Sequence, residues 1–92
     1  MTMRRKGYDD YSISKEEAVK ILEYCSSENA NLGVILKCAM ESNKTIGDLL
    51  FKSVTQRKSY EKLGYVPITK NDFYGYRRKM IWLIYKEMEN VT

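Results

Sequence analysis

The chain has 92 residues, a length that suits one small domain with one modest hydrophobic core. Hydrophobic residues make up 43% of it and are spread along its length, which argues against disorder, while one proline and five glycines favour helices over a β-sandwich or barrel. It contains no histidine, so the usual general base near neutral pH and the Ser-His and Cys-His nucleophile pairs are absent. We therefore expect a small all-α protein that is not an enzyme and uses no cofactor.

The same sequence bears on compartment and on metal binding. No apolar run approaches the ~20 residues that cross a bilayer, and the basic start MTMRRKGYDD has no apolar stretch behind it. We expect a cytoplasmic protein that does not enter a membrane. Cys25 and Cys38 each lie in an apolar helical pattern, where a reduced cysteine behaves as a small hydrophobic residue. Two cysteines without histidine fall short of the four ligands of a structural zinc site, so no metal is expected.

The chain divides into a short arm and one domain. Residues 1–11 are expected to form a flexible basic arm, and residues 12–92 a single helical domain. Basic arms can touch a nucleic-acid backbone, but a frayed terminus is the simpler interpretation of this one. The arm's cations are Arg4, Arg5 and Lys6.

Apolar spacing predicts three short helices in the first half of the domain. Ser14-x-x-Glu17 is a capping box that opens the first helix. The second helix follows a polar break and should run to about Ser42, and Thr45-x-x-Asp48 is expected to cap the third. These helices should supply most of the core.

A short fourth helix over residues 55–63 should come next, ended by Gly64 in a left-handed conformation. The only proline then enforces a turn before the long final helix, which we expect to span 69–89 with Thr69 as its N-cap and Asp72 in its first turn. The predicted fold is a bundle of four to five helices, ending in a helix-turn-helix-like unit over residues 55–89.

Two faces of the final helix carry apolar or aromatic residues. The stripe expected to face the core is Phe73, Tyr76, Met80, Leu83, Ile84, Met88 and Val91. A flanking basic and aromatic stripe contains Lys70, Asn71, Tyr74, Arg78, Ile81, Trp82 and Tyr85. Such a helix needs two partners, its own domain and something else.

Charge indicates what the second partner is. Residues 52–79 contain eight Lys or Arg against two acids, a net +6 within a chain whose total is +4. In a helix-turn-helix, the first turns of the second helix meet base edges in the major groove. Arg can read guanine and Asn can read adenine, while Lys holds phosphate. The candidate nucleic-acid-binding residues are therefore Lys58, Lys62, Lys70, Asn71, Tyr74, Arg77, Arg78 and Lys79.

The segment KSYEKLGYVPITKNDFYGYRRKMIWLI resembles the helix-turn-helix of sigma-factor region 4. More narrowly, it is similar to the ArpU and RinA type of small phage transcription regulators in Gram-positive hosts. The runs SYEKL at 59–63 and FYGYRRK at 73–79 carry this resemblance. It implies a phage or mobile-element origin, a role in transcription regulation, and DNA contacts at Tyr74, Arg77, Arg78 and Lys79.

Other interpretations of the same face stay open. Trp82 and Tyr85 are residue types that anchor interfaces, so the chain is alternatively a phage-encoded protein-interaction module or an inhibitor of a host protein. Packing of this stripe under the first or second helix would explain it without a partner. A homodimer is a further expectation, because helix-turn-helix proteins commonly bind paired half-sites, and RNA binding through the same surface also stays open. Double-stranded DNA is the partner we expect.

Overall fold

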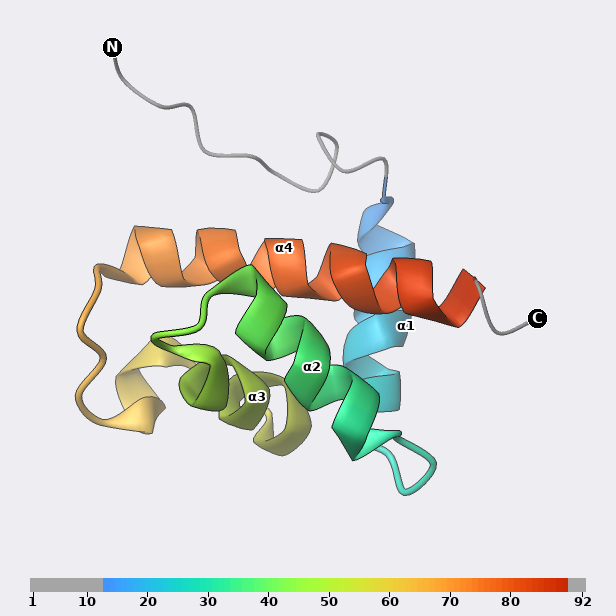
Figure 1. Ribbon diagram of the computed structural model, residues 1–92, viewed down its shortest axis with the longest axis horizontal. Coiled ribbons are helices and arrows are strands. Elements are labelled where there is room, and N and C mark those ends of the chain that lie inside the picture. The colour runs from blue at the N-terminus through green and yellow to red at the C-terminus, as the bar shows by residue number, and fades with distance from the viewer. Residues whose placement is uncertain (1–12, 90–92) are drawn as a thin grey trace, which may run out of the picture.

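The computed structural model describes residues 13–89, which form four α-helices and one short 3₁₀ helix and contain no strand. In chain order the elements are α1 (Lys15–Cys25), α2 (Leu32–Ser42), α3 (Gly47–Gln56), η2 (Tyr60–Leu63) and α4 (Lys70–Glu89). α4 lies along one edge of the bundle, α2 and α3 lie beneath it, and α1 crosses behind its C-terminal half (Figure 1). The expected all-α bundle with a long final helix is confirmed. The predicted basic arm and Val91 lie outside the described residues.

α1 begins where its capping box predicts. The Ser14 hydroxyl accepts a hydrogen bond from the Glu17 backbone N–H at 3.1 Å, and the Glu17 carboxylate accepts one from the Ser14 N–H at 3.2 Å. Each bond occupies an N–H that the first turn of a helix leaves without a partner. The inward stripe of α1 is Ala18, Ile21 and Cys25.

The start of α3 differs from the prediction. Thr45 does not cap it; instead the Asn43 side-chain oxygen accepts hydrogen bonds from the N–H groups of Thr45 at 2.9 Å and Ile46 at 3.3 Å. The turn that Asn43 makes delays the helix until Gly47. A Cβ at Gly47 would lie 3.1 Å from the Met40 Cα, so this glycine permits α2 and α3 to lie close together.

The predicted helix over residues 55–63 is wrong. α3 continues to Gln56 and ends because Arg57 takes a left-handed conformation, with φ 56°. The Ser53 hydroxyl donates to the Lys58 carbonyl at 2.8 Å, and the Ser53 carbonyl accepts from the Lys58 N–H at 3.1 Å, which closes the helix end. Only the single turn η2 remains of the first helix of the expected helix-turn-helix-like unit.

Tyr60 holds the turn between η2 and α4. Its hydroxyl donates to the Ile68 carbonyl at 2.7 Å, and its ring lies edge-on to that of Phe73 with centroids 5.6 Å apart. Gly64 follows η2 with φ 85° and ψ −138°, so its φ is positive as predicted, but its conformation is not the left-handed helical one that was expected. Thr69 caps α4 as predicted, since its hydroxyl accepts from the Asp72 N–H at 3.2 Å.

The core corrects the predicted faces of α4. Ile81, assigned to the flanking stripe, is fully buried, whereas Tyr76 and Met88, assigned to the core, are 37% and 41% exposed. The buried sector is shifted towards Ile81 because α1, α2 and α3 all contact α4. The buried hydrophobic residues are Ile13, Ala18, Ile21, Cys25, Ile35, Cys38, Ala39, Ile46, Leu50, Val54, Val66, Phe73, Met80, Ile81 and Ile84.

Both cysteines are buried and unpaired, as predicted. The pKa of each thiol is raised to about 11, chiefly by burial; for Cys25, the neighbouring Cys38 adds to this rise and the Arg77 charge opposes it. Within residues 13–89, no helix combines the length and apolar character that crossing a bilayer requires.

Candidate nucleic-acid interface

The eight predicted nucleic-acid-binding residues do not share one face. Asn71, Arg78 and Lys79 lie on the side of α4 turned away from the core, and Lys62 is exposed on η2. Lys58, Tyr74 and Arg77 instead line a pocket between α3 and α4. Lys70 is paired within the protein. The structure therefore presents two separate basic sites where the sequence indicated one.

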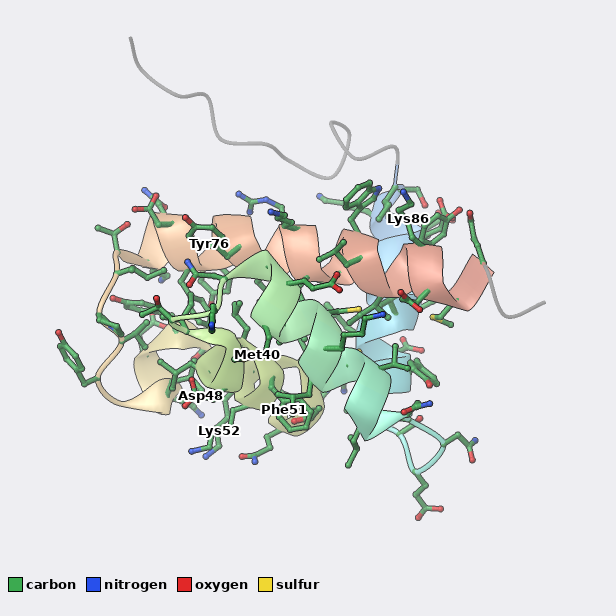
Figure 2. All side chains as sticks on the ribbon, in the orientation of Figure 1. Met40, Asp48, Phe51, Lys52, Tyr76 and Lys86 are labelled. Carbon is green, nitrogen blue, oxygen red and sulfur yellow. The ribbon has the colours of Figure 1, made fainter. Side chains whose placement is uncertain are left out.

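The first site is the outer α4 surface, which we define as Asn71, Arg78, Lys79, Trp82 and Lys86. Asn71, Arg78, Trp82 and Lys86 follow one another at helical spacing, on the side opposite Phe73 and Ile84. Lys86 lies on the edge of α4 remote from α2 and α3 (Figure 2). α2 and α3 lie on the other side of α4, and α1 passes behind only its C-terminal half, so the N-terminal half of this edge is not covered by a described helix (Figure 1).

Aromatic side chains on the second half of α4 have partners within the protein. The Lys86 ammonium lies 4.8 Å from the centre of the Trp82 ring, a cation–π contact. Hydrogen bonding of the Tyr85 hydroxyl with the carboxylates of Glu89 and, to a lesser extent, Glu17 raises the pKa of Tyr85 to about 12. Because Glu17 belongs to α1, Tyr85, predicted as an interface residue, interacts with another helix of its own domain.

Lys70 and Glu61 form an ion pair across the turn, with a nitrogen–oxygen distance of 2.5 Å. The hydrogen bond between them lowers the pKa of Glu61 and raises that of Lys70. Both side chains are exposed, so water screens the pair and its contribution to stability is small. The pair nevertheless directs the Lys70 ammonium towards η2.

The second site is the inner pocket, a cavity of about 260 Å³ between the end of α3, α4 and α1. Three cationic side chains contribute to its wall and no acid does. Its lining residues are Leu22, Ser53, Val54, Arg57, Lys58, Ser59, Tyr74 and Arg77.

Arg77 belongs to the buried side of α4. It follows Phe73 by one helical turn and precedes Met80 and Ile81, and its guanidinium carbon lies 5.6 Å from the centre of the Tyr74 ring. Its Nε is inaccessible to solvent and has no hydrogen-bond partner among the described residues. Tyr74 is also half-buried, and its hydroxyl oxygen accepts a hydrogen bond from the Tyr60 N–H at 3.1 Å.

Some residues of these two sites were not singled out from the sequence. Arg57 and Ser53 line the inner pocket because α3 extends further than predicted and turns sharply at its end. Lys86 could have been found from its position four residues after Trp82, a spacing that brings side chains together on a helix. Lys52, counted in the basic segment, points away from α4 on the far side of α3 (Figure 2).

Neither site has the composition of a metal centre. Across the described part of the chain, no three Cys, Asp or Glu side chains lie close enough to hold a metal ion together. Hydrogen bonding and charge pairing with an anion are the chemistry that the two sites offer.

A scan against protein-family models finds no family that matches the chain, and searches of curated proteins and solved structures find no significant match.

Proposed function

We propose that this chain is a small DNA-binding protein, a transcription regulator of a phage or mobile element, which docks the N-terminal half of α4 on duplex DNA. The observation that carries the proposal is a row of cations on an uncovered helix edge. Lys79 has no acidic partner within residues 13–89 and follows Arg78 on this edge, which Lys86 continues towards the C-terminus of α4. Surface cations of this kind attract a phosphate backbone.

The dimensions of α4 suit this docking. A helix of its 20 residues is about 30 Å long, and the major groove, about 12 Å wide, admits one α-helix. Asn71 and Arg78 lie two turns apart on the outer edge and have the chemistry to read adenine and guanine. Lys79 follows Arg78 directly along the chain, where a phosphate would lie. A symmetric dimer would place two such helices on paired half-sites.

Fluorescence anisotropy with duplex DNA, at several salt concentrations, tests the proposal. We expect Lys79→Ala to weaken binding of every duplex and to reduce the slope of log K against log salt by about one, since one phosphate contact is lost. Lys52→Ala is the charge-matched control, because Lys52 lies on the far side of α3 (Figure 2). Absence of duplex binding at low salt, or equal effects of the two changes, would refute the proposal.

A second candidate function, protein binding, is favoured by a separate observation on α2. Leu32, Leu36 and Met40 recur every four residues along this helix and are 54%, 42% and 40% exposed. An apolar stripe on a helix surface is a common docking face for a partner. The sequence suggested Trp82 and Tyr85 for this role, but the Tyr85 hydroxyl already interacts with the carboxylates of Glu89 and Glu17.

The two functions respond to different changes. Leu36→Glu adds a charge in the middle of the α2 stripe without altering the outer α4 surface. If the chain works by binding a protein, this change should abolish the oligomer or complex measured by light scattering and leave duplex affinity as it was. A complex that survives Leu36→Glu would exclude the α2 stripe as its interface.

A further inference from the structure

We propose that the inner pocket is a binding site for a phosphate group, with Arg77, Arg57 and Lys58 as its cations and the Tyr74 hydroxyl as a neutral donor. The site is distinct from the outer α4 surface, because Arg77 and Arg78 lie on different sides of α4. It does not rest on the proposed DNA docking.

The unsatisfied nitrogen of Arg77 is the first observation behind this site. Nε has lost its access to water and has no acceptor among residues 13–89. A buried donor without a partner costs free energy, and more so when the group is charged. The side chain lines the pocket, where an anion would supply the missing acceptor and charge.

Tyr74 is the second observation. Its hydroxyl oxygen already accepts the Tyr60 N–H at 3.1 Å, which fixes the position of the phenol. Its own hydrogen has no acceptor among the described residues, so it remains available to donate. The Tyr74 ring also lies against the guanidinium of Arg77, with 5.6 Å between the guanidinium carbon and the ring centre. Both donors are therefore positioned before any ligand arrives.

The negative end of the α3 dipole is not sufficient to explain why three cationic side chains line the inner pocket. A helix C-terminus carries about half a negative charge and attracts cations. Here the Ser53 carbonyl already accepts from the Lys58 N–H, and the Lys58 carbonyl accepts from the Ser53 hydroxyl. Arg57 and Lys58 form no ion pair within the described residues. Three full positive charges exceed what this helix end can neutralise.

The charge and shape of the pocket favour phosphate over a carboxylate. Guanidinium groups bind phosphate with two parallel hydrogen bonds, and a phosphomonoester carries nearly two negative charges at pH 7, where a carboxylate carries one. The cavity of about 260 Å³ holds more than one water molecule, each of which occupies about 30 Å³ in the liquid. There is space for a phosphate and for part of the group attached to it.

An NMR titration of the amide signals with inorganic phosphate tests the site directly. Chloride at matched ionic strength is the control for screening, and sulfate should compete because it has the same tetrahedral geometry. We expect saturable shifts confined to amides around the pocket, such as those of Ser53, Lys58 and Ser59. Shifts spread over all lysines, or equal shifts with chloride, would overturn the proposal.

Variants separate binding from a structural role. Arg77→Met should weaken phosphate binding by about tenfold or more, since one charged hydrogen-bonding group is lost. Arg57→Gly should weaken it while raising the thermal midpoint, because glycine adopts the left-handed conformation at this position without strain. Lys52→Ala should change neither property. If phosphate affinity survives both arginine changes, the pocket is not the site.

Two sources can supply the phosphate, and a competition experiment distinguishes them. If the pocket takes free phosphate or a small phosphomonoester, its signals should respond to inorganic phosphate and not to duplex DNA. If it takes a backbone phosphate, the duplex should displace inorganic phosphate, and Arg77→Met should lower duplex affinity as Lys79→Ala does. Loss of duplex binding in Lys79→Ala with intact phosphate binding would show that the two sites act separately. If neither inorganic phosphate nor a duplex backbone phosphate binds in the inner pocket, the phosphate site is refuted. The proposed docking of the outer α4 surface on DNA is not affected by that result.

Discussion

The Ser42 hydroxyl donates a hydrogen bond to the backbone carbonyl of Tyr76, with an oxygen–oxygen distance of 2.6 Å. Ser42 ends α2 and is only 5% exposed, so the bond joins α2 to the middle of α4 away from water. Ser42→Ala should lower the free energy of unfolding by about 1 kcal/mol, the usual net value of such a bond. Urea denaturation measures this change.

The control for Ser42 is Ser26→Ala. Ser26 is exposed, and its hydroxyl donates to carbonyls of its own helix end, so its loss should cost less than about 0.5 kcal/mol. Equal losses in the two variants would mean that the α2–α4 bond contributes nothing beyond an ordinary surface serine.

Two glycines should respond to alanine in opposite directions. Gly64 has φ 85° and ψ −138°, and a Cβ there meets nothing within 4 Å, so only backbone strain opposes Gly64→Ala. We expect it to lower the free energy of unfolding by about 1–3 kcal/mol.

Gly33 lies in the first turn of α2, and its added Cβ would make an ordinary 3.5 Å contact with Asn31. Gly33→Ala should therefore raise stability, by up to about 1 kcal/mol. Thermal denaturation of the two variants side by side checks both signs.

Stability should fall in acid through Glu17. Hydrogen bonds from the Ser14 backbone, and then from Tyr85 and the Ser14 hydroxyl, hold the pKa of the Glu17 carboxyl below its usual value. A carboxyl with a lowered folded-state pKa stabilises the fold above its unfolded pKa, and this stabilisation is lost as pH falls through the folded value.

Glu17→Gln keeps an acceptor oxygen for the cap and removes the titrating group. Its thermal midpoint should therefore depend less steeply on pH between about 5 and 3, the range in which a carboxyl with a lowered pKa protonates. Glu16→Gln, an exposed neighbour in the same turn, is the control. An identical pH dependence in the Glu17 variant and the unchanged protein would contradict the assignment.

The two cysteines should resist modification in the folded protein. Burial raises the pKa of Cys25 and Cys38 to about 11, so almost no thiolate is present at pH 8. A thiol-specific chromogenic disulfide reagent should react slowly with the native protein. In denaturant it should react quickly with two thiols per chain. Rapid native reaction of either thiol would show that α1 or α2 opens locally.

Capping patterns and apolar spacing predicted most of the helices because both are local. The Ser14 and Thr69 caps were each visible as a hydroxyl three residues before an acid, and both form. The end of α3 was not visible, because Arg57 takes a conformation that usually requires glycine, and the buried Ser53 stabilises it from within the helix. A side chain that closes a helix by bonding forward leaves no mark in hydrophobic periodicity.

The division of the basic residues depends on tertiary packing. Arg77 and Arg78 are the same residue type at adjacent positions. The prediction assigned α4 one face against its own domain, without knowing how many helices pack there. Because α1, α2 and α3 all contact α4, the buried sector is displaced towards Ile81 and includes Arg77, while Arg78 remains on the outer edge. The direction in which each arginine points depends on which helices pack against α4. The sequence of α4 alone does not reveal those helices.

The contact of α1 with α4 has a consequence for folding rate. α2 and α3 are joined by a four-residue connection and meet with little loss of chain entropy, whereas α1 and α4 are separated along the chain by every other helix. The α2–α3 pair is therefore the part expected in the folding nucleus, and the docking of α1 on α4 should come after the rate-limiting step. Changes at Glu17 or Tyr85 should then speed unfolding and leave the refolding rate nearly unchanged.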